Sequence, residues 1–214
     1  MLPFTPEVFF ANMAQYNEAI WPAQVGAYGL GLVVVLLLFR PTSWSSRLIA
    51  ALLAGAWIWI GTVYHLKHFA TINFAAPLFG FAFIVEGLLI AWSGVATRRI
   101  TFRFRADAAG WTGLALVTFA MAVYPFLGWL AGHAWPRGAV FGVAPCPTTI
   151  FTMGLLLLTE GRTPPHLAII PVLWALIGGS AVWLLSVPED LALPIAGFGG
   201  LGLILWKNRA APRT

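Results

Sequence analysis

The sequence has few charged residues and a single cysteine. Only 9% of its 214 residues are Asp, Glu, Lys or Arg, whereas 60% are hydrophobic. This balance excludes an ordinary soluble domain and is typical of a polytopic membrane protein. The lone cysteine, Cys146, excludes an intrachain disulfide and says little about the redox compartment. The length favours one transmembrane domain over residues 1–214, with little of the chain outside the membrane.

Several motifs that carry chemistry are also missing. The sequence contains no P-loop, HExxH, GxSxG or CxxC motif, so hydrolases and nucleotide-dependent enzymes have no support. A retinal protein needs a lysine inside its last span, whereas Lys67 and Lys207 both fall at predicted membrane edges. A non-enzymatic function is therefore favoured, and the sequence requires no cofactor. The formal charge of +5 does not indicate a nucleic-acid partner, because the basic residues lie between apolar runs.

Long apolar segments predict an all-α membrane protein built as a bundle of seven transmembrane helices. We expect the spans at about residues 22–39, 47–64, 74–95, 110–131, 143–159, 166–185 and 191–206. Ahead of them, Thr5, Pro6 and Glu7 form a helix start with a capping hydroxyl, a proline and an acid. Residues 5–20 therefore predict a short interfacial helix, although an ordinary lead-in to the first span fits them equally well.

Basic residues separate strongly between the two sides of the predicted bundle. Ten fall on one side, and only Lys67 and Arg137 fall on the other. Because cytoplasmic loops carry the excess of basic residues, the N-terminus is expected outside and the C-terminus in the cytoplasm. The ten are Arg40, Arg47, Arg98, Arg99, Arg103, Arg105, Arg162, Lys207, Arg209 and Arg213.

The most unusual stretch is Pro145-Cys146-Pro147 at the start of the fifth predicted helix. A proline restricts the residue before it and is favoured at the first helical position, so we expect Cys146 as the N-cap. A helix that ends near Thr159 is about 20 Å long, which is shorter than the hydrocarbon core of about 30 Å. We therefore expect this helix to begin below the membrane surface, as broken helices do at many membrane binding sites.

Three threonines, Thr148, Thr149 and Thr152, follow the cysteine. Thr148 and Thr152 are four residues apart and share a helix face, where exposed N–H groups and hydroxyls together suit an anion or a polar headgroup. The alternative is commoner in membrane helices, namely that each hydroxyl bonds back to a carbonyl of its own helix.

Glu86 is the only acidic residue near the middle of a predicted span. No lysine or arginine lies at a similar depth, so its partners are expected to be hydroxyl or indole groups, such as Trp57, Trp174 or Ser180. An intramembrane acid indicates either a proton or cation relay, or a neutral acid that bonds neighbouring helices together.

A second candidate site is a metal or thiol centre on the outer side. His65, His68, His133 and Cys146 all fall there, as do the acids Glu18, Glu189 and Asp190. Imidazole and thiolate ligands suit Zn²⁺ or Cu⁺, and a helix N-terminus favours the thiolate. A single haem held by His133 with His65 or His68 is a further alternative. No spacing matches a standard metal motif, so interfacial histidines and an apolar cysteine remain the plainer interpretation.

Three segments carry a resemblance to a known family. Residues Pro3–Phe10, Tyr16–Pro22 and Ala144–Thr148 resemble a family of small uncharacterised bacterial polytopic integral membrane proteins of unknown function. The resemblance covers the whole chain and implies a multi-pass protein of the bacterial inner membrane, with no assigned activity.

The hypothesis favoured by all these features is small-solute or ion transport, or ligand sensing, through an outer-facing polar cavity. The alternatives are a redox or soft-metal-handling protein, and an accessory subunit whose partners are copies of itself or a larger membrane complex.

Overall fold

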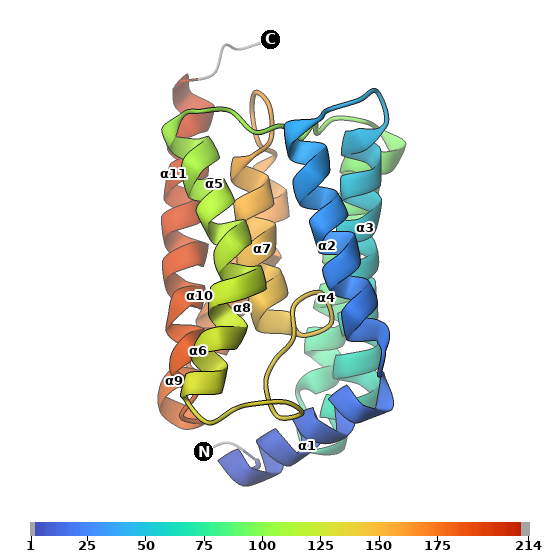
Figure 1. The fold of residues 1–214 in the computed structure, drawn as a ribbon, viewed down its shortest axis with the longest axis vertical. Coiled ribbons are helices and arrows are strands. Elements are labelled where there is room, and N and C mark those ends of the chain that lie inside the picture. Colours follow the sequence, from blue (N-terminus) through green and yellow to red (C-terminus); the bar gives the residue numbers. More distant parts are fainter. Residues whose placement is uncertain (1–2, 211–214) are drawn as a thin grey trace.

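The computed structural model describes residues 3–210, and its helices run side by side along one axis (Figure 1). Apart from an isolated β-bridge between Phe102 and Thr159, the regular structure of the described residues is helical. Arg213, one of the ten basic residues used to predict the orientation, lies outside the described residues.

Helix α1 (Pro6–Ala19) lies across the lower end of the bundle, and α2 (Ala23–Phe39) rises beside the other helices (Figure 1). The two helices meet at an angle of 81°. Pro22 stands at this break, where its missing N–H interrupts the helical hydrogen bonds. At the start of α1, a hydrogen bond from Thr5 lowers the pKa of the Glu7 carboxyl.

Most of the longer helices change geometry along their length, from α to 3₁₀ or π hydrogen bonding. In chain order the remaining elements are α3 (Ser45–Trp59), η1 (Ile60–His68), η2 (Phe69–Thr71), α4 (Ala76–Ile90), η3 (Ala91–Ala96), α5 (Ala108–Thr118), η4 (Phe119–Val123), α6 (Tyr124–Leu130), α7 (Pro145–Leu157), η5 (Pro165–Ala168), α8 (Ile169–Gly179), α9 (Ala181–Leu184), η6 (Pro188–Leu191), α10 (Ala192–Pro194), η7 (Ile195–Gly199) and α11 (Gly200–Ala210).

A π-helical segment precedes Pro125 in the helix that begins at Ala108. Residues Phe119–Val123 adopt π geometry immediately before the proline, and α-helix resumes at Tyr124. A proline within a helix clashes with the carbonyl four residues earlier, and the wider π turn relieves this crowding. The rod from Ala108 to Leu130 therefore continues as one helix.

Within residues 3–210, five helices are long and apolar enough to cross a membrane, so the protein is a multi-pass membrane protein by length and composition. They are Ser45–Thr71, Ala76–Ala96, Ala108–Leu130, Pro165–Leu184 and Pro188–Ala210. The bent pair of α1 and α2 adds a sixth if it counts as one span. The predicted count of seven is not confirmed, because α7 has only 13 residues and α2 qualifies only together with α1.

The helix that carries the predicted second span is longer than expected. The helix that begins at Ser45 continues to Thr71 instead of ending at residue 64. Lysine and histidine are tolerated within helices, and the first proline after them is Pro77, so the polar run does not stop the helix. His65 and His68 lie in η1, the π-helical part of this helix.

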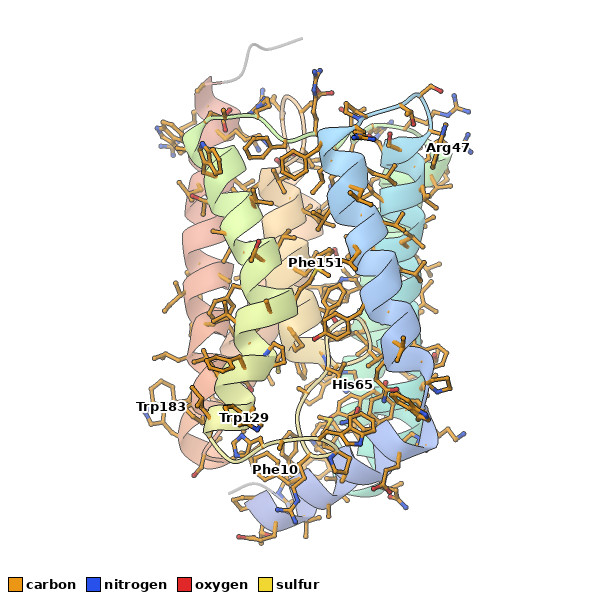
Figure 2. The ribbon with its side chains drawn as sticks, in the orientation of Figure 1. Phe10, Arg47, His65, Trp129, Phe151 and Trp183 are labelled. Atoms are coloured by element: carbon orange, nitrogen blue, oxygen red, sulfur yellow. The ribbon has the colours of Figure 1, made fainter. Side chains whose placement is uncertain are left out.

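Exposed tryptophans mark both ends of the bundle. Trp44, Trp92, Trp111 and Trp206 are exposed near the upper loops, and Trp21, Trp129, Trp135 and Trp183 are exposed at the lower end. Figure 2 shows Trp129 and Trp183 at this lower end. Trp111 and Trp129 are 18 residues apart on one continuous helix, which corresponds to about 27 Å. This separation is close to the hydrocarbon thickness of about 30 Å, as expected for aromatic belts at two membrane interfaces.

Helix α7 forms the centre of the bundle. All of its 13 residues except Cys146 are buried, and it packs against α3, α5, α8 and α11. The contact with α5 depends on two glycines: a Cβ atom on Gly154 would lie 2.7 Å from the Gly113 carbonyl oxygen, and the reverse distance is also 2.7 Å. The two backbones therefore approach as closely as small residues allow in membrane helix pairs.

We predict that Gly154→Ala destabilises the protein by about 1–3 kcal/mol, because the added methyl group forces α5 and α7 apart. Thermal unfolding of the purified protein in detergent measures the effect. Gly202→Ala is the matched control, since a Cβ atom there meets nothing within 4 Å. Equal unfolding midpoints for the two variants would contradict the close approach.

Candidate functional site

A cavity of about 300 Å³ lies near the lower end of the bundle, between α1, α6, α7, α8 and the end of η1. Aromatic side chains make up much of its wall. They include Phe10, Tyr64, Phe69, Phe79, Tyr124 and Trp174. A mainly apolar cavity that contains a few convergent polar groups is the usual form of a small-molecule site.

Asp190 is the central polar residue of this cavity. It lies in η6 and is 3% exposed. The Tyr124 hydroxyl donates a hydrogen bond to Oδ1 at 2.5 Å, and the Cys146 thiol donates to Oδ2 at 3.5 Å. Residues from α6, α7 and η6 thus meet at one carboxyl group. Within residues 3–210, no lysine, arginine or histidine forms an ion pair with Asp190.

Glu189, the neighbour of Asp190, also lines the cavity and is 4% exposed. Its Oε1 lies 3.0 Å from Nδ1 of His133, and that imidazole stacks on the Phe10 ring of α1 with centroids 4.2 Å apart. Oε2 of Glu189 has no hydrogen-bond partner among the described residues. Oε1 of Glu189 therefore holds the loop after α6 through His133, while Oε2 remains able to accept a hydrogen bond.

Trp174 of α8 contributes a second unused polar group. Its side chain lines the cavity, is 7% exposed, and its Nε1 has no hydrogen-bond partner within the described chain. A Cβ atom on Gly178 would lie 3.2 Å from this nitrogen and 3.5 Å from Sγ of Cys146. The same Cβ atom would lie 2.8 Å from Cδ1 of Leu193, so only a glycine fits at this position beside the two polar atoms.

The start of α7 differs from the expectation by two residues. Ala144 is the N-cap, with extended backbone at φ −114° and ψ 148°, and Pro145 is the first helical residue. Cys146 therefore lies in the first turn and is not the cap. Two prolines are tolerated here, because the first N–H groups of a helix have no intrahelical acceptors. Figure 1 shows α7 beginning part-way along the bundle, where residues 131–144 reach it from below.

Two of the three threonines on α7 bond back to their own helix. The Thr148 hydroxyl donates to the Ala144 carbonyl at 2.7 Å and accepts from the Gly142 N–H at 3.0 Å. The Thr152 hydroxyl donates to the Thr148 carbonyl at 2.8 Å and accepts from Nε1 of Trp57 at 2.9 Å. The Thr149 hydroxyl is buried without a partner in the described residues. These contacts favour the back-bonding alternative for Thr148 and Thr152.

Glu86 and His65 are two further buried polar residues, each 0% exposed. Neither carboxyl oxygen of Glu86 and neither ring nitrogen of His65 has a hydrogen-bond partner in residues 3–210. His65 lies in the lower half of the bundle (Figure 2), with its ring centroid 4.7 Å from Phe83 and 5.1 Å from Trp174. Phe83 and Glu86 are three residues apart on α4 and share a face.

The hydrogen-bond partners expected for Glu86 are engaged elsewhere or unpaired. Trp57 donates to Thr152, and Ser180 donates to the carbonyl of Ile177. Trp174 makes no hydrogen bond among the described residues.

A family model described as "Family of unknown function (DUF6064)" matches residues 6–214. The chain belongs to the DUF6064 family. The match includes every residue of the cavity except Pro3, and it confirms the resemblance as far as a family of unknown function. Comparisons with curated proteins and with solved structures gave no match.

In this DUF6064 protein the four predicted metal ligands are spread over different surroundings. His65 is enclosed by aromatic rings, His68 packs edge-on against Tyr16, His133 pairs with Glu189, and Cys146 faces Asp190. Among the described residues, no three His, Cys, Asp or Glu side chains lie close enough to hold a metal ion. The carboxylate beside Cys146 is also unlike the electropositive surroundings that favour a thiolate.

Helix α1 is attached to the bundle by buried polar side chains that the sequence pattern does not reveal. The Tyr16 hydroxyl donates to the Val143 carbonyl at 2.7 Å, and the Asn17 amide donates to the Pro136 carbonyl at 2.6 Å. Asn12 donates to the His68 carbonyl at 3.0 Å. These contacts hold the segment before α7 and the end of η1, so α1 closes the lower end of the cavity region.

The opposite end of α7 is held by Lys207 of α11, which sequence analysis placed only at a membrane edge. Its ammonium group donates to the carbonyl of Leu157 at 3.3 Å, to the carbonyl of Thr159 at 2.6 Å and to the hydroxyl of Thr163 at 3.0 Å. The last carbonyls of a helix have no intrahelical donors, and a cation there is favoured by the helix dipole. Lys207 therefore completes the C-terminus of α7.

We predict that Lys207→Met lowers the free energy of unfolding by about 1–3 kcal/mol, because it leaves buried carbonyl groups without a donor. Thermal unfolding in detergent provides the measurement. Lys67→Met, which removes an exposed lysine, is the control and is expected to leave the midpoint unchanged. A Lys207→Met protein as stable as the control would show that Lys207 does not support α7.

Proposed function

We propose that the protein binds a small solute in the cavity beneath α7, as part of solute passage or ligand sensing. The observation that carries this proposal is the convergence of three buried polar side chains on one aromatic cavity. Asp190, Glu189 and Trp174 come from two different helical segments, and two of them retain unused hydrogen-bonding atoms. Buried polar groups are normally satisfied, so unused capacity that faces a cavity supports a ligand.

We place the cavity on the outer side of the bacterial inner membrane, with seven transmembrane segments and α7 as a half-helix. Loops 40–44, 97–107 and 158–164 carry six of the twelve Lys and Arg residues, and all three loops lie at the end opposite α1 (Figure 1). The positive-inside rule assigns that end to the cytoplasm, together with the C-terminus.

We expect a C-terminal fusion to green fluorescent protein to fluoresce in intact bacteria, because that fusion protein folds in the cytoplasm. A C-terminal alkaline phosphatase fusion is expected to be inactive, because it matures only outside. The reverse pattern of activities would overturn the orientation.

Beyond the cavity, buried polar groups continue along α4 toward the basic end. Trp174 contacts His65 and Phe83, and Glu86 follows Phe83 on the same face of α4. Ser93 is seven residues after Glu86, is buried, and lies 3.4 Å from Nε2 of His166. Ionisable residues within membrane spans usually mark ion or proton pathways. We assign Glu86 as the intramembrane residue of a route for protons or small cations.

We predict that Glu86→Gln lowers proton or cation flux into proteoliposomes at least tenfold, because the amide cannot release a proton or carry a charge. Flux is followed with a pH-sensitive dye under an imposed potential. Glu18→Gln, on the exposed side of α1, is the matched control and is expected to transport normally. Equal flux through both variants, with equal unfolding midpoints, would rule out ion passage through Glu86 and leave ligand sensing as the proposed function.

A further inference from the structure

We infer that the cavity beneath α7 recognises a small organic cation, a protonated amine attached to an apolar or aromatic group. This inference rests on the proposed function and specifies the class of ligand. It follows from the charge of the cavity, the chemistry of its wall and its unused polar atoms.

The cavity contains buried acids and no buried basic residue among the described residues. Asp190 accepts hydrogen bonds at both oxygens, from the neutral donors Tyr124 and Cys146, and no cationic side chain in residues 3–210 pairs with it. Glu189 is adjacent and shares a single histidine contact. A buried carboxylate without a cation carries a large desolvation cost, and a positively charged ligand offsets that cost.

Among residues 3–210, Arg137 is the one basic residue that lines the cavity. It belongs to the segment before α7, is exposed, and forms no ion pair within the described residues. It therefore lies at the solvent side and does not neutralise the buried acids. A ligand that also carried a carboxylate would meet Arg137, which makes a zwitterion the competing class.

Aromatic rings form the wall of the cavity around these acids. Tyr64 stacks on Phe69 with ring centroids 5.4 Å apart, and Phe79 meets Trp174 edge-on at 5.5 Å. These contacts hold the rings in place around the cavity. Aromatic faces attract organic ammonium groups through their negative quadrupole, whereas an inorganic cation requires a shell of oxygen ligands. The wall therefore favours an organic cation over a metal ion.

Two polar atoms of the cavity wall have no hydrogen-bond partner among the described residues. Oε2 of Glu189 is an acceptor and Nε1 of Trp174 is a donor, and both residues line the cavity. A primary ammonium group has three N–H donors, enough for Asp190 and Glu189 together. The Trp174 N–H is then available to an oxygen atom on the same ligand or to its aromatic face.

The test uses the purified full-length protein in nonionic detergent and four probes of similar shape. They are 2-phenylethylamine, 2-phenylethanol, 3-phenylpropionate and phenylalanine, which are cationic, neutral, anionic and zwitterionic. Calorimetric titration is expected to give at least tenfold tighter binding for the amine than for each of the other three. Equal or tighter binding of the alcohol, the anion or the zwitterion overturns the inference, as does a lack of amine binding.

Asp190→Asn tests the proposed site of charge recognition and is expected to weaken amine binding at least tenfold while leaving binding of the alcohol unchanged. Glu18→Gln is the control with an exposed acid and is expected to bind as the wild type does. The unfolding midpoint of each variant shows whether it is folded. If Asp190→Asn fails to fold, Glu189→Gln replaces it, since this change keeps the shape of the side chain and removes the charge of the second acid that lines the cavity. Unchanged amine affinity in the folded variant overturns the inference.

The outcomes separate the ligand class from the proposed function. If another probe binds and the amine does not, the cation inference fails and the ligand site survives. If none of the four probes binds and Glu86→Gln leaves flux unchanged, both fail.

A protonated amine reaches a cavity near a membrane surface either as a free solute or as an ethanolamine headgroup. Short-chain phosphatidylethanolamine is compared with short-chain phosphatidylglycerol to distinguish these sources. Binding of the ethanolamine lipid in competition with 2-phenylethylamine assigns the headgroup, and a lack of competition assigns a free amine.

Discussion

The structure depends on how both ends of one short buried helix are satisfied. Helix α7 has 13 residues and lies within an apolar bundle, so neither end reaches solvent by length alone. Backbone groups without partners are costly in such surroundings. At the C-terminus, the ammonium group of Lys207 donates to the last carbonyls. At the N-terminus, two prolines remove two of the unpaired N–H groups, and the Thr148 hydroxyl anchors the preceding turn.

The early start of α7 also creates the candidate site. Because α7 begins part-way along the bundle, residues 131–144 and α1 occupy the remaining space and hold it through Tyr16 and Asn17. The packing is incomplete, and a cavity of about 300 Å³ remains beside Cys146. Asp190 comes from η6 and Tyr124 from α6, so three separate segments supply one polar cluster. The short helix thus brings polar groups from three segments to the wall of one cavity.

Three acids are buried within the bundle. Asp190, Glu189 and Glu86 are each less than 5% exposed, and replacement of buried ionic groups by apolar residues is often neutral or stabilising. Trp174 at the cavity contacts His65, His65 contacts Phe83, and Glu86 follows Phe83 by three residues on α4. Local conflicts with the rule of an apolar interior are expected at functional sites, where binding offsets the cost.

Local sequence patterns determined the membrane class, the α-helical architecture, the family resemblance and the short helix α7. Apolar runs and prolines affect the backbone only within a few residues, so their effects can be predicted from the sequence. They also predicted that Cys146, Glu189 and Asp190 share one end of the bundle. The polar clusters were decided by tertiary structure alone. Cys146 and Asp190 are 44 residues apart, Tyr124 and Asp190 are 66 apart, and Lys207 meets Thr159 from 48 residues away. The packing also separated the predicted metal ligands and extended the second span to Thr71. Hydropathy describes each residue alone, whereas hydrogen-bond partners depend on which helix faces pack together.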